Sequence, residues 1–156
     1  MKTYMTARVF VDTNILVYCY DRADPVKRAR AIETVDQVVK SRVGAISTQI
    51  LAEFYTTVTR KLSEPLSSDD AWSRLKQFAT IWTVLDLTPQ VVLEAVRGVR
   101  ERTLSYWDAQ IWAVARRRRI PVILSEDFQH GSVLEGVRFL NPLRTGAREQ
   151  EWAEFI

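Results

Sequence analysis

Short apolar runs alternate with longer segments of helical periodicity along this chain, and that alternation limits the folds it can adopt. Between the runs, apolar residues recur every three or four positions, which is the spacing of one face of a helix. Short buried strands that alternate with helices form a parallel sheet whose two faces are covered by those helices. The sequence therefore predicts an α/β fold. The runs expected to form strands are 8–11, 44–47, 81–85, 121–124 and 137–140.

Capping residues indicate where several of the helices begin. Asp24 is followed by a proline, which is favoured at the first helical position, so a helix is expected from there to about Val39. Ser67 and Asp70 match a capping box, and Thr48 is expected to cap the helix after the second strand. The predicted buried face of the helix that begins at Asp24 consists of Val26, Ala29, Ile32, Val35 and Val39.

The chain has 156 residues, a length that supports one domain with a short appendage. Residues 1–142 are expected to form the domain, and residues 143–156 a tail or short helix that ends in the apolar residues Trp152, Phe155 and Ile156. The hydrophobic fraction of 47% is enough for one core. Together with a net charge of only +3, it excludes a largely disordered chain.

Cys19 is the only cysteine in the sequence, which excludes a disulfide framework and a zinc site built from cysteines. No secretory segment is recognised near the N-terminus. The longest early apolar run, 9–20, contains Asp12 and Asn14 and is therefore not expected to span a bilayer. These features predict a cytoplasmic protein that is not embedded in a membrane.

Four acidic residues lie at the ends of predicted strands or near the beginnings of helices. Asp12 ends the first strand, and Glu53 lies about one turn into the helix after the second. Asp108 lies in the first turn of the helix that precedes the 121–124 strand, and Asp127 follows the end of that strand. Active sites of open α/β sheets form at the carboxyl ends of the strands. We therefore expect these four carboxylates to share one cleft.

Each of the four acids also has a structural explanation when it is taken alone. Asp12 can cap the helix that follows it, and Ser105 with Asp108 matches a capping box. Glu53 fits the solvated face of its helix, and Asp127 lies in a turn-like segment. The prediction of a site depends on all four acids lying at the same end of a parallel sheet.

A cluster of carboxylates in a partly buried cleft needs either retained protons or a bound cation, because like charges raise one another's pKa. Carboxylate oxygens without histidine or cysteine nearby suit Mg²⁺ or Mn²⁺ better than Zn²⁺. An ion held in this way polarises a phosphate, generates hydroxide from water and stabilises the leaving oxygen. The reaction that needs this arrangement is hydrolysis of a phosphodiester bond.

The segments around these acids resemble a known family. Residues 11–18, with the sequence VDTNILVY, resemble the opening motif of PIN-domain nucleases, particularly the VapC-type toxins of toxin–antitoxin pairs. Glu53 within ILAEFY, Asp108 within SYWDAQI and Asp127 within SEDF match the second, third and fourth acids of that family. The order and spacing of the motifs agree over about residues 9–142.

The resemblance implies a three-layer α/β/α sandwich with a mostly parallel sheet of about five strands. It also implies an Mg²⁺- or Mn²⁺-dependent endoribonuclease that cleaves RNA as the toxin of a type II toxin–antitoxin module. Such a protein would form a homodimer and be inhibited by a small antitoxin whose tail enters the active-site groove. Asp12 and Asp108 would bind the metal, whereas Glu53 and Asp127 would bind a second ion or orient the attacking water.

Neighbouring residues extend the expected site. By the same resemblance, Asn14 and Ser125 would supply supporting polar groups. Glu126 adjoins Asp127 and is an alternative fourth acid, although a hydroxyl residue two positions before the acid favours Asp127. Trp107 is expected at the rim of the cleft, where an RNA base could stack on it.

Basic residues give a second, less specific signal. Residues 116–119 are four consecutive arginines at the end of a helix, where they either pair with the helix dipole or contact RNA. Arg22, Lys27 and Arg28 follow the first motif and are equally placed to touch RNA. His130, the only histidine, is expected to be a loop residue rather than a catalytic base.

Two other functions are compatible with parts of this pattern. A phosphatase built around a phosphorylated aspartate would need a second acid in the first motif, and Asp12-Thr13-Asn14 has none. A non-catalytic RNA-binding or protein-interaction module with a degenerate PIN-like site would use the acids only as caps. Dependence of the activity on metal distinguishes the nuclease from the scaffold.

Overall fold

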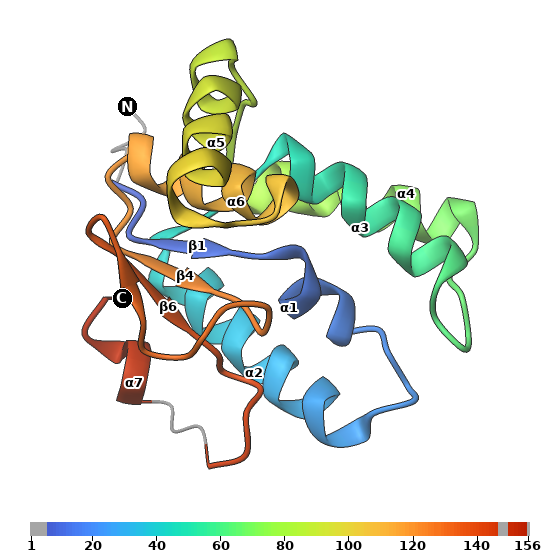
Figure 1. Cartoon of the computed structure of the whole chain (residues 1–156). Helices are drawn as coiled ribbons and strands as arrows, with labels where there is room; N and C mark the ends of the chain where they lie inside the picture. Colours follow the sequence, from blue (N-terminus) through green and yellow to red (C-terminus); the bar gives the residue numbers. More distant parts are fainter. Residues whose placement is uncertain (1–5, 147–149, 156) are drawn as a thin grey trace, which may run out of the picture.

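A six-stranded sheet with the strand order β3-β2-β1-β4-β6-β5 runs through the middle of the molecule (Figure 1). This computed structural model describes residues 6–146 and 150–155, and the sheet is the one that these residues form. The strands are β1 (Val9–Val11), β2 (Gly44–Ser47), β3 (Thr83–Leu85), β4 (Val122–Leu124), β5 (Val133–Leu134) and β6 (Val137–Leu140).

Neighbouring strands are parallel except for the last pair, β5 and β6, which is antiparallel. In the centre, Val9 of β1 pairs with Gly44 of β2 on one side and with Val122 of β4 on the other. The sheet has one strand more than the five predicted. β5 escapes prediction because it has only two residues and is joined to β6 by the tight turn at Glu135-Gly136, where both residues have positive φ.

Helices cover both faces of the sheet, which confirms the predicted three-layer α/β/α sandwich. In Figure 1, α5 and α6 lie on one side of the strands and α2 lies on the other. None of the helices in the described part of the chain is long and apolar enough to cross a bilayer. The helices are α1 (Thr13–Tyr18), α2 (Pro25–Ser41), α3 (Thr48–Arg60), α4 (Ser68–Ile81), α5 (Pro89–Arg102), α6 (Tyr106–Arg117) and α7 (Gln150–Ala153).

Capping side chains mark the beginnings of the helices. Asp24 and Ser67 each accept a hydrogen bond from the backbone N–H three residues ahead, at 3.0 Å, as predicted. The cap of α3 is Ser47 and not Thr48. Ser47 keeps the extended backbone of β2, so its hydroxyl can accept a hydrogen bond from the N–H of Ile50, whereas Thr48 is already helical.

The buried face of α2 differs from the predicted one. Val26 is 60% exposed and Ile32 is 46% exposed. Val35 and Val39 of the predicted stripe pack partly buried against the core, whereas the fully buried stripe is the adjacent one, which has smaller side chains. The hydroxyl of Thr34 in this stripe donates a 2.8 Å hydrogen bond to the carbonyl oxygen of Arg30, so it is satisfied within the helix. The residues of this buried stripe are Ala31, Thr34 and Val38.

The boundary between α4 and β3 also differs from the prediction. α4 continues to Ile81, so β3 begins at Thr83 and not at residue 81. Trp82 lies between the two elements and is 6% exposed. A Cβ atom on Gly44 would lie 2.5 Å from the ring of Trp82, so the close approach of the ring to β2 requires glycine there.

The C-terminal segment folds back onto the domain. Trp152 in α7 is 3% exposed, and its indole N–H donates a 3.2 Å hydrogen bond to the side-chain oxygen of Gln37 in α2. Phe155 packs partly buried against the core. The last apolar residue of the expected tail, Ile156, lies outside the described residues.

Candidate active site

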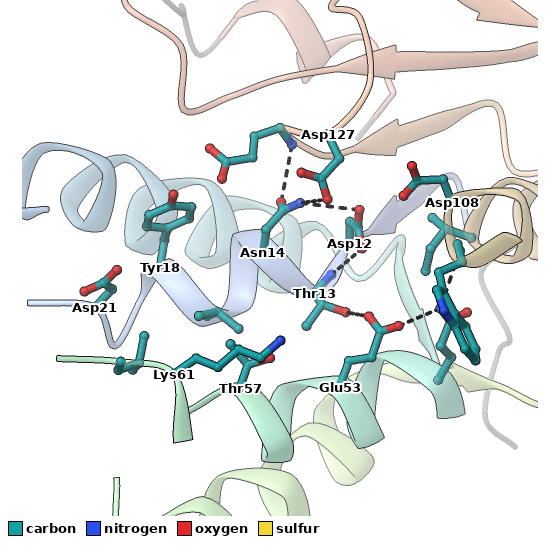
Figure 2. Close-up of a pocket in the computed structure, with 16 residues that line it drawn as sticks. Asp12, Thr13, Asn14, Tyr18, Asp21, Glu53, Thr57, Lys61, Asp108 and Asp127 are labelled. Atoms are coloured by element: carbon teal, nitrogen blue, oxygen red, sulfur yellow. Dashed lines mark hydrogen bonds between the residues drawn. The ribbon is translucent and has the colours of Figure 1, made fainter. Parts of the chain in front are cut away.

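A cleft of about 440 Å³ opens at the carboxyl end of the parallel strands. Its walls come from α1, α3, the start of α6 and the loop after β4, four segments that are far apart in the sequence. Figure 2 shows the side chains that line it. All four predicted acids are among them, namely Asp12, Glu53, Asp108 and Asp127. The topology of a parallel sheet therefore brings these carboxylates into one hollow, as expected.

Asp12 lies deepest in the cleft and is 4% exposed. One carboxylate oxygen accepts a 2.7 Å hydrogen bond from the backbone N–H of Thr13, which makes Asp12 the cap of α1. The other oxygen accepts a 2.7 Å hydrogen bond from the hydroxyl of Ser125, the residue that follows β4. The two explanations of Asp12 are therefore compatible, because one oxygen caps the helix while the side chain also lines the cleft.

Burial raises the pKa of the Asp12 carboxyl to about 7, although the hydrogen bonds from Ser125 and Thr13 act in the opposite direction. The negative charges of Asp127 and Glu53 contribute to the increase. Without a counter-charge, Asp12 therefore holds its proton to a higher pH than an ordinary aspartate. A cation bound in the cleft would favour the ionised carboxylate.

Glu53 is held from two sides on α3. Its Oε2 accepts a 2.8 Å hydrogen bond from the hydroxyl of Thr13, and its Oε1 accepts one of 2.8 Å from the side-chain amide of Gln49. Glu53 therefore does not lie on a freely solvated helix face, although that explanation fits its sequence context. Its carboxylate is oriented toward the same hollow as Asp12 (Figure 2).

A chain of buried polar side chains continues behind Glu53. Gln110 of α6 donates a 2.7 Å hydrogen bond to the side-chain oxygen of Gln49, and the hydroxyl of Tyr106 donates one of 2.8 Å to Gln110. Gln110 is only 1% exposed. The sequence-based prediction missed this chain; its one signal was a glutamine on an otherwise apolar stretch of each helix.

Asp108 lies in the first turn of α6, where its backbone N–H donates a 3.2 Å hydrogen bond to the hydroxyl of Ser105. The capping-box explanation is thus correct for the backbone of Asp108. Its carboxylate accepts no hydrogen bond from the part of the chain that the structure describes. The carboxylate oxygens are therefore available to a ligand in the cleft.

Asn14 connects the acids of the two central strands. Its side-chain amide donates to Asp127 at 3.0 Å and lies within 3.4 Å of Asp12 and 3.3 Å of Ser125. Its oxygen accepts a 3.3 Å hydrogen bond from the backbone N–H of Glu126. Partial burial raises the pKa of Asp127, and the nearby charge of Asp108 adds to the increase, while the hydrogen bond from Asn14 opposes it.

Glu126 and Asp127 both line the cleft but have different partners. Glu126 forms a 3.0 Å ion pair with Lys27, which neutralises its charge. Among the described residues, the Asp127 carboxylate accepts a side-chain hydrogen bond only from the neutral amide of Asn14, and the negative charge of Asp108 lies nearby. The geometry thus favours Asp127 as the acid whose charge requires a bound cation.

The side chains in the cleft fit a hard divalent cation. The acidic donors are all carboxylate oxygens, and the buried Asp12 lacks a positive partner in the described structure. Within the described residues, no three Asp, Glu, His or Cys side chains form a ready-made metal cage. Mg²⁺ is commonly held by one or two carboxylates and completed by water and substrate phosphates, so a partial protein site suits it.

Three of the seven basic residues considered for RNA binding have partners away from the cleft. Arg116 forms a 2.7 Å ion pair with Glu94 and does not line the cleft. Arg22 pairs with Glu64 at 3.4 Å, and Arg28 donates to a backbone carbonyl. His130 accepts a hydrogen bond from a loop backbone N–H, consistent with a structural loop residue.

Lys61 is a cation in the cleft that the sequence-based prediction missed. It follows directly after α3, is exposed, and has no ion pair with the described residues. Figure 2 shows its side chain reaching toward the space between the acids. A single lysine at the end of a helix gives no sequence signal, so only the fold identifies it.

Comparison with known proteins gives one sequence family. The family model of the PIN domain matches residues 9–133. No curated protein is similar enough in sequence to match the chain.

Several solved structures share the fold at low sequence identity. A toxin–antitoxin complex from Klebsiella pneumoniae is 18% identical, with a TM-score of 0.62 over 86% of this chain and 97% of that one. VapC20 of Mycobacterium tuberculosis, a sarcin–ricin loop cleaving toxin, is 21% identical, with a TM-score of 0.62 over 81% and 97%. VapBC2 from Rickettsia felis, bound to a DNA fragment from its promoter, is 16% identical, with a TM-score of 0.61 over 85% and 97%.

The family model covers both central strands and all four acids that line the cleft. The overall fold is similar to that of the solved structures that match. Sequence and fold lead to the same conclusion: the chain belongs to the PIN domain family.

Proposed function

We propose that the chain is a metal-dependent endoribonuclease that acts as the toxin of a type II toxin–antitoxin module. The observation that carries the proposal is the set of four carboxylates that line one cleft, including Asp12, whose pKa is raised by burial. Membership of the PIN family supports a nuclease. The similarity to toxin–antitoxin proteins, one of which is a sarcin–ricin loop cleaving toxin, supports the RNA substrate and the toxin role.

In the proposed reaction, Asp12 and Asp108 hold Mg²⁺ or Mn²⁺, and Glu53 and Asp127 complete the site. The bound ion would supply electrophilic stabilisation of the scissile phosphate and lower the pKa of an attacking water. Thr13 keeps the Glu53 carboxylate facing the cleft, where it can orient that water and accept its proton.

Charge outside the acids supports a nucleic-acid substrate. The net charge of the chain is +3, and Lys61 lines the cleft without an acidic partner in the described structure. A cation at this position can contact a phosphate next to the one that is cleaved, which makes binding dependent on salt.

The proposed protein partners are a small antitoxin and a second copy of this chain. Several of the solved structures with this fold are toxin–antitoxin complexes, which supports the antitoxin. An exposed apolar row on α5 supports a protein contact of either kind, since Leu93 is 70% exposed and is followed by Val96 and Val99. We place the protein in the cytoplasm.

The test is cleavage of end-labelled RNA in Mg²⁺, in Mn²⁺ or in EDTA, by the wild type and by Asp108→Asn. Asp69→Asn is the matched control, because Asp69 is an exposed acid in the first turn of α4 and does not line the cleft. We expect cleavage that requires metal, is lost in Asp108→Asn and is kept in Asp69→Asn.

Two outcomes would contradict the proposal. Cleavage that persists equally in EDTA and in Asp108→Asn would come from a contaminating nuclease and not from this cleft. Absence of cleavage together with absence of Mg²⁺ or Mn²⁺ binding in calorimetry would mean that the acids serve as caps in a non-catalytic module.

A further inference from the structure

A second hollow adjoins the acidic cleft on the side of Glu53. It has a volume of about 540 Å³, which is within the usual range for a small-ligand site. The two hollows share part of their walls, so they form one continuous groove. The shared residues are Gln49, Glu53, Thr57, Lys61 and Trp107.

Trp107 stands in the wall between the two hollows and is 62% exposed. Its ring meets the ring of Tyr106 edge to face, with centroids 5.0 Å apart, and Tyr106 is tied by its hydroxyl to the buried Gln110. The backbone carbonyl of Trp107 lies 3.5 Å from the side-chain amide of Gln49. The large apolar ring of Trp107 is thus held at the groove, and its exposed surface is available for contact with a ligand.

Trp72 provides an internal comparison for this exposed ring. It is 60% exposed on α4, lines neither hollow, and has the ammonium group of Lys76 5.6 Å from its ring centre. Exposure alone therefore does not distinguish Trp107. The distinguishing feature is its position directly before Asp108, at the junction of an acidic cleft and a second hollow.

The chemistry of the second hollow matches a nucleotide. Leu87 is 39% exposed and, with Trp107, provides apolar surface for the faces of a flat ring. Thr57 adds a hydroxyl, and Lys61 provides a positive charge where the two hollows meet. A ligand that combines a flat ring with a negative phosphate would use all of these groups.

We propose that the second hollow binds one nucleobase of the RNA, stacked on Trp107, while Lys61 contacts the adjoining phosphate. This inference rests on the proposed nuclease function, because it concerns the nucleotide next to the bond that is cleaved. A base can enter the hollow only when it is unpaired, so the enzyme selects a single-stranded segment. A protein tail in the same hollow is the competing possibility, and the shared wall with the acidic cleft favours the substrate.

The test combines removal of a base with removal of the ring. The probe is the shortest single-stranded RNA that the wild type cleaves, synthesised with one abasic nucleotide at each position in turn. We expect one position beside the scissile bond where the missing base lowers kcat/KM by about tenfold, the usual effect of losing one stacking contact. In Trp107→Ala, removal of that base should cause no further loss of kcat/KM. In Trp107→Phe, which keeps an aromatic ring, most of the dependence of kcat/KM on that base should return. The control, Trp72→Ala, should behave as the wild type.

Several outcomes would overturn the inference while leaving the nuclease intact. If the fold reductions in kcat/KM caused by base removal and by Trp107→Ala multiply at every position, the base and the Trp107 ring do not interact. If Trp107→Ala lowers Mg²⁺ affinity in calorimetry, the ring only supports the adjacent Asp108. If Trp107→Ala leaves kcat/KM unchanged on all substrates, the hollow belongs to a protein partner. Failure of the wild type to cleave any RNA would instead overturn the proposed function, and this inference with it.

Discussion

The hydroxyl of Ser125 donates a 2.7 Å hydrogen bond to the carboxylate of Asp12, which joins the ends of the two central strands. This bond stabilises the ionised carboxylate, but burial has the larger effect and raises the pKa of Asp12 from 3.8 to about 7. The site is therefore built at a cost to the stability of the metal-free protein, and that cost depends on pH.

The first prediction concerns this dependence on pH. The pKa of Asp12 is higher in the folded than in the unfolded state, so the folded chain binds more protons between about pH 4 and pH 7. The metal-free protein therefore loses stability as the pH rises through this window. In EDTA at pH 8, Asp12→Asn should be more stable than the wild type by up to about 4 kcal/mol, as measured by urea unfolding.

The same variant should lose this advantage below pH 4, where the wild-type carboxyl is protonated in both states. Mg²⁺ should raise the melting temperature of the wild type and have little effect on Asp12→Asn, because bound metal stabilises the folded state only when its ligands are present. Asp69→Asn is the control and should follow the wild type in every condition. Equal stability of Asp12→Asn and wild type at pH 8 would show that burial does not strain this carboxylate.

The second prediction concerns the buried glutamines behind Glu53. Gln110→Ala removes the donor to Gln49, so Gln49 no longer holds the Glu53 carboxylate in one position. Outer groups of this kind usually contribute 10- to 100-fold to activity or metal affinity. We expect kcat to fall by about tenfold or more with little change in KM, and stability to fall by about 1–3 kcal/mol for the unsatisfied polar group.

Tyr106→Phe provides a milder version of the same test, because it removes only the last hydroxyl of the chain and keeps the ring. Its effect on kcat should have the same sign as that of Gln110→Ala and a smaller size. A purely structural role would reduce the fraction of folded protein without altering kcat per folded molecule. Unchanged kcat in both variants would mean that Glu53 does not need this support.

The third prediction distinguishes the two neighbouring acids after β4. Asp127→Asn should reduce cleavage by about 100-fold or more, because it removes a charge proposed to orient water or bind an ion. Glu126→Gln should have a much smaller effect, since the ion pair with Lys27 already neutralises Glu126. Both substitutions are nearly isosteric, so a comparison of their kcat values separates charge from packing. A larger loss in Glu126→Gln would reverse the assignment.

The convergence of the acids could be predicted from the sequence because it depends only on topology. Asp12 and Asp127 follow strands that are neighbours in a parallel sheet, and any such sheet brings their carboxyl ends together. The role of Asp12 as a cap was equally visible. The structure shows that the capping and site explanations are not alternatives, since the two carboxylate oxygens have different partners.

The features that were not predicted depend on packing between distant segments. Gln49 and Gln110 are 61 positions apart, and their hydrogen bond exists only because the fold brings the start of α3 close to α6 behind the site. The fully buried stripe of α2 was not predicted, although Val35 and Val39 of the predicted stripe pack against the core, because periodicity defines the spacing of a stripe and not which of two adjacent stripes is buried more deeply. Lys61 lines the cleft only because the C-terminal end of α3 lies beside it, and the position of that end depends on the packing of the whole domain.

The fourth prediction tests the packing of α5 against α6, the helix that carries Asp108. Gly98 faces the ring of Trp112, and a Cβ atom on Gly98 would lie 2.8 Å from that ring. Alanine is favoured over glycine within a helix by about 1 kcal/mol. Trp112 is fully buried, so its ring cannot move away without disturbing the core, and the steric cost of about 1–3 kcal/mol should exceed the gain in helix propensity.

Gly98→Ala should therefore lower the free energy of unfolding in urea, whereas Gly131→Ala tests a loop glycine with open space around its Cβ position but a positive φ. The loop variant should lose stability only through backbone strain, without any change in the environment of Trp112. Near-ultraviolet circular dichroism distinguishes the two mechanisms, because only Gly98→Ala displaces a buried indole ring. A more stable Gly98→Ala with an unchanged spectrum would show that α5 and α6 have room to separate, and that Asp108 is held less rigidly than this packing indicates.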